Sequence, residues 1–192
     1  LRELENRPFK NQIASVTIDD DQAEKNWIDL EPPLPQQPEK SKALATPYAI
    51  QISNDDSIVI ASADASKKIF TIEAKTGKLL DQILVGNGPR GIALEKGKLS
   101  NAWVYNAIDN TVSLLDISDP QKLKSISTIN LQDPTHPSVK KGRAIFNSAE
   151  FSASGTFSCA SCHPNGHTDQ LLWVLDTPYV RGGRQIMPRL TQ

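Results

Sequence analysis

The two cysteines of the 192-residue chain stand three positions apart, and a histidine follows the second: Cys159, Cys162 and His163 in SCASCHPNGHTD, residues 158–169. A Cys-x-x-Cys-His run is the attachment signature of a c-type haem. The two thiols form thioether bonds with the vinyl groups of the porphyrin, and the next residue offers an imidazole nitrogen to the iron. The spacing therefore predicts one covalent haem c, held by Cys159 and Cys162 and ligated by His163.

Three other kinds of chemistry use paired cysteines. A thioredoxin-like redox pair follows a strand of a βαβ unit, and the sequence shows no such unit. Zinc would need His167 beside the other three ligands, whereas a structural site separates its two ligand pairs by about a dozen residues. A disulfide across two residues closes a loop too short to stabilise much. Haem attachment is the preferred interpretation, and because haem would consume both thiols, no disulfide is expected.

The sixth iron ligand has several candidates. Met187 is the only methionine and lies 24 residues after His163, between Gly-Gly and Pro in RGGRQIMPRL. A thioether ligand gives a low-spin iron suited to electron transfer, while a core gap-filler is the alternative role. His167 is too near His163 to reach the opposite haem face and suits a polar or propionate-side role. His136 reads as a solvated linker residue. Tyr179 and an open sixth site complete the set.

Supporting roles fall to aromatic and basic residues around the motif. Trp173 and Phe157 would pack against the haem, which needs an apolar environment. Arg184, together with Arg181 and Arg189, could pair with the haem propionates because guanidinium groups suit carboxylates. A solvated surface position is the alternative for each arginine.

Two consecutive segments, residues 46–87 and 88–130, resemble each other. Pro47 matches Pro89, and Ile60 is aligned with Val104, at an offset of 42 to 44 residues. A repeat of about 40–45 residues with four strands is typical of a propeller blade. Two similar β-meanders in another all-β domain are the alternative. The expected strands are 48–53, 57–63, 68–74 and 82–86 in the first unit, and 90–95, 102–107, 111–117 and 125–131 in the second.

The remaining chain is assigned around these units. Residues 1–45 form an N-terminal segment, in which 11–21 reads as part of a further blade and the proline-rich run 31–40 as an extended connector. A propeller closes with about four to eight blades, so further blades would come from a longer parent chain or another subunit. The β-strand pattern ends after Leu131, and a domain boundary is placed near Asp133. A helix is expected over 140–146. The predicted fold is mainly β, a partial propeller of about two four-stranded blades (46–131), followed by a small α-helical cytochrome c domain (132–192).

Both parts resemble known families. VGNGPRGIAL followed by NAWVYNAIDNTVSLLDIS resembles the YVTN-type β-propeller repeat. KKGRAIFNSAEFSASGTFSCASCHPNGHTDQLLW is similar to the first-haem region of di-haem cytochrome c peroxidase and MauG-like proteins. Gln170 replaces the glycine usual there, and the chain has one haem motif where that family has two. The resemblance implies electron or peroxidase chemistry, but the peroxidase activity needs the second haem.

Bulk properties limit the function classes. The net charge of −1 gives no reason to expect nucleic acid, and no apolar run is long enough to span a bilayer. No signal peptide is recognised at Leu1. Covalent haem attachment takes place outside the bacterial cytoplasmic membrane, so a periplasmic or cell-surface location is expected.

Three functions follow from these observations. The first is an electron-transfer cytochrome linked to a propeller, working with a redox partner protein. The second is part of a di-haem peroxidase-like oxidoreductase whose second haem domain lies elsewhere. The third is a propeller-based binding module with a structural haem domain.

Overall fold

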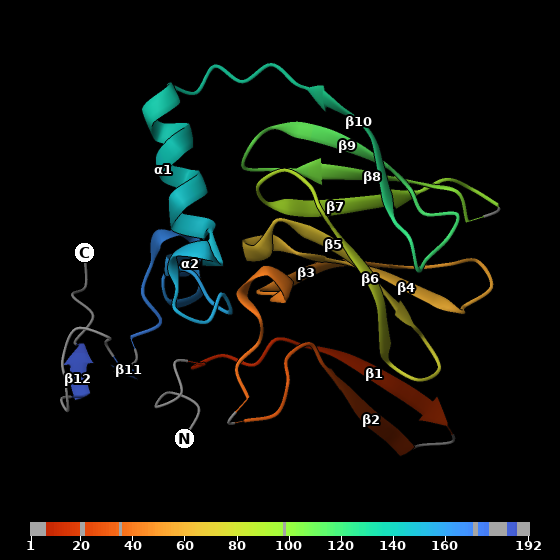
Figure 1. Cartoon of the computed structure of the whole chain (residues 1–192), viewed down its shortest axis with the longest axis horizontal. Helices are drawn as coiled ribbons and strands as arrows, with labels where there is room; N and C mark the ends of the chain where they lie inside the picture. Colours follow the sequence, from red (N-terminus) through yellow and green to blue (C-terminus); the bar gives the residue numbers. More distant parts are fainter. Residues whose placement is uncertain are drawn as a thin grey trace.

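The fold is mainly β, as predicted, and is seen in a computed structural model that describes residues 7–19, 22–34, 36–97, 99–170, 173–176 and 184–187. Two four-stranded antiparallel sheets form its centre, a β-hairpin lies against one of them, and a helical segment stands at one end (Figure 1). Within the described ranges, no helix has the length and apolar character needed to cross a membrane.

The two sheets are propeller-like blades in which each strand pairs with the next along the chain. Blade 1 consists of β3 (Pro47–Ile52), β4 (Ile58–Ala63), β5 (Lys68–Glu73) and β6 (Lys78–Leu84), and blade 2 of β7 (Pro89–Leu94), β8 (Asn101–Asn106), β9 (Thr111–Asp116) and β10 (Lys124–Asn130). Seven of the eight predicted strands are confirmed to within about two residues. The fourth begins at Lys78 rather than residue 82, because Gly77, with φ of 71°, turns the chain so that Lys78 pairs directly with Glu73.

The two blades match position by position at offsets of 42 and 43 residues. Thr46 and Gly88 share a left-handed backbone, with φ of 57° and 71°. The carbonyl of each accepts a hydrogen bond from the equivalent amide, that of Asp64 at 2.8 Å and that of Ala107 at 2.7 Å. Pairing of Ala63 with Lys68 and of Asn106 with Thr111 fixes the same offset in the strands. Ile60 therefore corresponds to Trp103, which corrects the sequence alignment of Ile60 with Val104 by one residue.

The core has two main layers. Between the blades lies an aliphatic cluster that includes Ile60 and Ile69 of blade 1 and Val104 and Leu115 of blade 2. The other face of blade 1 is covered by the hairpin of β1 (Gln12–Asp19) and β2 (Gln22–Asp29), whose Ile13 and Ile28 pack near Phe70 and Ile72. Residues 11–21, predicted to be part of a further blade, contain β1, which belongs to a two-stranded sheet.

The helical segment follows β10 along the edge of blade 2 (Figure 1). It contains α1 (Pro137–Asn147), the short turns η4 (Ala149–Phe151) and η5 (Pro164–Gly166), and the one-turn helix α2 (Cys159–Cys162). The predicted helix over 140–146 is thus confirmed and is longer at its N-terminus, where Pro137 occupies the first turn and the His136 side chain accepts from the Ser138 amide. Assignment of residues 132–192 to a cytochrome c domain stays a prediction.

Polar contacts tie this segment to the blades. The Arg90 guanidinium on β7 makes two contacts of 3.1 Å with the buried Asp64 carboxylate, and its Nη2 also lies 3.1 Å from Asn147 Oδ1 at the end of α1. The Asn11 side-chain amide donates to the Thr156 carbonyl at 2.9 Å. These bonds hold the end of α1 against blade 2 and the approach to the cysteine motif against Asn11, which directly precedes β1.

Candidate functional site

The cysteine motif folds as a single helical turn. Ser158 precedes it in extended conformation and its amide donates to Ser161 Oγ at 3.0 Å, which closes the N-terminus of α2. At the other end the His163 amide donates to the Cys159 carbonyl at 2.9 Å. Residues three apart in a helix share a face, so this turn presents both thiols on the same side. Cys159 is exposed and Cys162 is half-buried.

The His163 ring is oriented by a backbone group. Its Nδ1 lies 3.0 Å from the His167 carbonyl oxygen. A carbonyl oxygen can only accept, so Nδ1 carries the proton and Nε2 of the neutral ring keeps its lone pair. Metal-ligating histidines commonly donate their second nitrogen in this way. His163 is therefore arranged as a ligand through Nε2.

The turn that supplies this carbonyl depends on two left-handed residues. Asn165 and Gly166 have φ of 54° and 79°, and the Gly166 amide donates to the His163 carbonyl at 3.1 Å. The reversal brings the His167 carbonyl back to the imidazole of His163. His167 thus contributes its backbone to the site, while its own side chain is exposed.

The motif lies beside one aromatic ring of α1, a helix that also exposes apolar side chains. The Phe146 ring of α1 lies 6.4 Å from the His163 ring, centroid to centroid. Within α1 no side chain is fully buried, and Val139 and Ile145 are 48% and 43% exposed. Amphipathic helices normally gain their stability by packing an apolar face. Haem, a large apolar macrocycle, fits a site with two thiols, an oriented imidazole and this apolar surface.

The other predicted site residues lie in three places. Trp173 and Met187 are paired across the short hairpin of β11 (Trp173–Asp176) and β12 (Arg184–Met187), and Arg184 is paired with Asp176; only the backbone of these strands is described. Phe157 stacks 6.3 Å from Phe9, centroid to centroid. Tyr179, Arg181 and Arg189 lie outside the described residues.

His136 and the alternative zinc site can be judged from geometry. His136 begins α1, and Phe146, beside His163, is about 15 Å further along the helix axis at 1.5 Å per residue. His136 is thus remote from the motif. In the described part of the chain, no three His, Cys, Asp or Glu side chains converge as metal ligands, so the motif and His167 do not form a preorganised zinc site.

Sequence reasoning missed two features of this region. The His167 carbonyl carries no signal in residue type, although the Asn-Gly pair before it indicated a turn. The Arg90–Asp64–Asn147 network joins residues 26 and 57 positions apart, and no local pattern points to it.

Comparison with known proteins gives partial matches. No family model matches the chain. It is 42% identical over 60 residues to hydrazine synthase subunit gamma of Kuenenia stuttgartiensis, covering 26% of this chain and 17% of that protein. A solved Kuenenia stuttgartiensis hydrazine synthase chain matches with 26% identity and a TM-score of 0.42, covering 47% of this chain and 24% of the other.

Two propeller-type structures are similar at lower identity. The β-propeller domain of Cps50 (Swd1) from Myceliophteria thermophila has a TM-score of 0.49 and 16% identity, covering 63% of this chain and 38% of that one. The periplasmic gluconolactonase of Pseudomonas aeruginosa has a TM-score of 0.48 and 16% identity, covering 65% and 35%. The chain thus spans less than two-fifths of each protein it matches here, and its own two sheets show the propeller-like architecture.

Proposed function

We propose that the chain is a c-type cytochrome that carries one covalent haem at Cys159 and Cys162 and transfers electrons from a position fixed on a β-propeller. One observation carries the proposal: the two thiols share one helical turn with an imidazole whose Nδ1 is bound by the His167 carbonyl, 3.0 Å away. That arrangement leaves Nε2 as a ligand and supports haem better than a thiol redox pair, which has no need of the adjacent oriented imidazole.

The haem would supply one-electron chemistry between ferric and ferrous iron. Cys159 and Cys162 would hold the macrocycle by two thioether bonds, and His163 would supply a nitrogen ligand to the iron. The His167 carbonyl fixes the ring plane and makes the imidazole a stronger donor. The exposed apolar residues of α1, with Phe146, offer a wall that excludes water from one part of the haem.

Met187 would supply a second ligand to the iron, and Arg184 would pair with the haem propionates. Trp173 is the cross-strand neighbour of Met187, so an aromatic residue and a thioether stand on adjacent backbones. A six-coordinate iron with a thioether ligand favours electron transfer over peroxide chemistry. Met187→Ala should remove a weak near-infrared sulfur-to-iron band and lower the potential; an unchanged spectrum would reject Met187.

The partial match to a hydrazine synthase subunit supports a second candidate. In this alternative the chain is part of a larger haem oxidoreductase, in which a second haem domain or a partner subunit completes the chemistry. The face of blade 2 that carries Trp103 and Tyr105 has no sheet against it in the described part of the chain, and it gives a place for a further sheet from such an assembly. Because haem c is attached outside the cytoplasm, a periplasmic or cell-surface location belongs to both candidates.

Intact mass of the chain, produced with a haem-attachment system, tests the proposal. The expected result is the polypeptide plus one haem, with pigment retained after acid–acetone extraction. The double variant Cys159→Ala/Cys162→Ala should lose the pigment on extraction. A polypeptide mass without haem in the parent would overturn attachment.

Two histidine variants form a matched pair. His163→Ala should convert the haem spectrum to one without the native axial ligand. His167→Ala keeps the backbone carbonyl that orients His163, so its spectrum should match the parent. Equal spectra for His163→Ala and the parent would exclude His163 as the ligand.

A further inference from the structure

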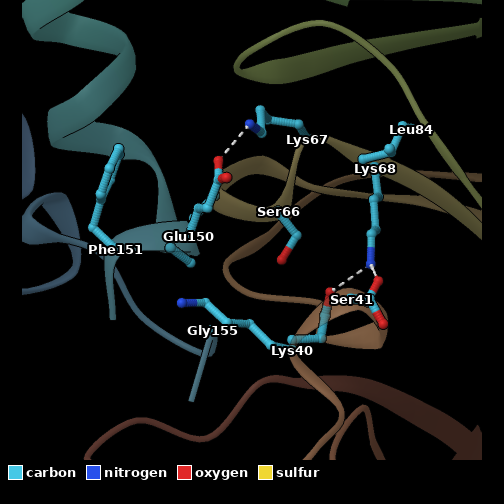
Figure 2. Close-up of a pocket in the computed structure, with 12 residues that line it drawn as sticks. Lys40, Ser41, Ser66, Lys67, Lys68, Leu84, Glu150, Phe151 and Gly155 are labelled. Carbon is cyan, nitrogen blue, oxygen red and sulfur yellow. Dashed lines mark hydrogen bonds and ion pairs between the residues drawn. The ribbon is translucent and has the colours of Figure 1, made fainter. Parts of the chain in front are cut away.

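A cavity of about 640 Å³ opens where blade 1 meets the helical segment, and neither cysteine is among its lining residues (Figure 2). Four parts of the chain line it: the turn at Lys40 and Ser41, the β4–β5 connection at Ser66 to Lys68, Leu84 at the end of β6, and the stretch from Ala149 to Gly155. Gly155, with φ of 72°, lets this stretch approach closely, since a Cβ there would lie 3.0 Å from Lys40 Cγ. The volume of the cavity lies in the range of small-molecule sites, about 300–1,000 Å³.

One wall of the cavity holds a buried cation. Lys68 is 6% exposed, and its Nζ donates to the carbonyls of Ser41 and Ala43 and to the side-chain oxygen of Gln82. All three acceptors are neutral, and among the described residues no carboxylate forms an ion pair with this amine. Burial lowers the pKa of Lys68 accordingly. Buried charges are normally compensated, so this wall lacks a counter-ion.

The other charged residues of the lining are two lysines and one glutamate. Lys67 lies 3.1 Å from Glu150, which offsets its charge. Lys40 extends its amine across the floor of the cavity, and the Ser66 side chain points into the space above it (Figure 2). Ser66 Oγ accepts from the Ala45 amide at 2.8 Å, so its hydroxyl proton can be donated to a ligand. Three lysines thus face one glutamate.

Apolar groups complete the lining. Ala43, Ala65 and Ala149 form part of the walls, and Phe151 and Leu84 stand at the rim, 66% and 65% exposed. A large exposed apolar side chain on each side of a cationic cavity indicates a ligand that is apolar at one end.

We propose that this cavity binds an amphiphilic carboxylate, with its carboxylate on Lys40 and Ser66 and its apolar body between Phe151 and Leu84. Lys68 supplies the uncompensated positive charge behind the carboxylate; its three protons are already engaged, so it acts through its field rather than by a direct bond. The site is independent of haem attachment, since it shares no side chain with the cysteine motif.

Isothermal titration of the full chain with decanoate tests the proposal. Saturable binding is expected, and decanol, which lacks the charge, should bind at least tenfold more weakly. Lys40→Met should weaken decanoate binding about tenfold, in line with the loss of one charge-assisted hydrogen bond. Lys42→Met is the matched control: Lys42 lies in the same turn, pairs with Glu39 at 2.6 Å and does not line the cavity, so its affinity should equal the parent's.

A second variant separates the field of Lys68 from direct contact. Lys68→Met should also weaken decanoate binding while leaving decanol binding unchanged, provided that circular dichroism shows the parent fold; if it does not fold, Lys40→Met against Lys42→Met decides. Absence of saturable decanoate binding, equal affinities for decanoate and decanol, or equal effects of Lys40→Met and Lys42→Met would each overturn the site.

Discussion

Blade 1 and blade 2 share a backbone and differ in what covers them. Ile60 and Ser62 of blade 1 have 0% exposure, whereas Trp103 and Tyr105, at the equivalent positions of blade 2, are 42% and 41% exposed. Blade 1 lies between the β1–β2 hairpin and blade 2, while the corresponding face of blade 2 has no sheet against it in the described structure (Figure 1). The same position in the repeat is therefore a core site in one blade and a surface site in the other.

The strand sequences reflect this difference. β4 reads IVIASA and is buried on both faces, while β8 reads NAWVYN and alternates between buried and exposed residues. Aromatic side chains with a polar atom suit half-exposed positions, since one end can remain solvated. Local strand propensity places the strand, and its neighbours decide which face is core.

The largest expected effect contrasts Ile60 and Trp103, which occupy equivalent positions in the two blades. Ile60→Ala leaves a cavity between the blades and should lower the free energy of unfolding by about 3 kcal/mol. Trp103→Ala removes a side chain that is already partly solvated and should cost less than about 1 kcal/mol. Urea denaturation measures both. Equal losses would mean that the outer face of blade 2 is covered in solution, and the contrast between the blades would then fail.

The second contrast concerns the left-handed residue before each blade. Gly88→Thr adds a Cβ that would lie 2.7 Å from Ile108 Cγ1 at a φ of 71°, so a loss of about 2 kcal/mol is expected. The reciprocal Thr46→Gly relieves a β-branched residue at φ of 57° and should be neutral or stabilise by about 0.5 kcal/mol, because the added freedom of the unfolded chain offsets part of the relief. Thermal unfolding of both variants checks the pair; a stabilising Gly88→Thr would break the equivalence of the two turns.

Sequence reasoning succeeded where the signal was local. The repeat period and the Ile- and Val-rich runs located seven strands, while the assignment of Cys159, Cys162 and His163 to haem stays a prediction. The predicted start of β6 was four residues late, because residues 78–81 (KLLD) show no alternation of apolar and polar side chains. The turn at Gly77 sets the actual start of the strand. The docking of the helical segment was not foreseeable, since Arg90 meets Asp64 and Asn147 only after both blades have formed. The role of the His167 carbonyl is likewise a property of backbone geometry.

The third prediction concerns the Arg90–Asp64 ion pair, which helps to link the helical segment to the blades. The carboxylate of this pair is present at only one of the two equivalent positions in the repeat. Asp64 of blade 1 corresponds to Ala107 of blade 2, and its carboxylate raises the pKa of Arg90. Asp64→Ala, which copies blade 2, should cost about 1–2 kcal/mol, a value below that for a fully buried pair because Arg90 is partly solvated. Urea denaturation checks the loss, and proteolysis should show faster cleavage near Asn147. Asp56→Asn removes the charge of an exposed turn residue whose φ of 56° Asn also adopts; it is the control and should change neither measurement.

The smallest expected effect lies in the turns that join the first two strands of each blade. In blade 1, Asp55 Oδ1 accepts from Ser53 Oγ at 2.5 Å and from Ser57 Oγ at 2.8 Å, and these bonds lower the pKa of Asp55 to about 2. In blade 2, Ser100 and Asn101 donate to Glu95 and lower its pKa, by hydrogen bonds of 2.8 Å each.

A carboxyl whose pKa is lower in the folded state stabilises the fold above its unfolded pKa, about 4, and loses that contribution as the pH falls. Asp55→Asn should therefore reduce stability at pH 7, and its difference from the parent should shrink between pH 4 and pH 2. Glu95→Gln should follow the same direction in blade 2. Urea denaturation of both variants at pH 7, 4 and 2.5 makes the comparison, and a penalty for Asp55→Asn that does not change with pH would show that the charge of this turn contributes nothing to the stability of blade 1.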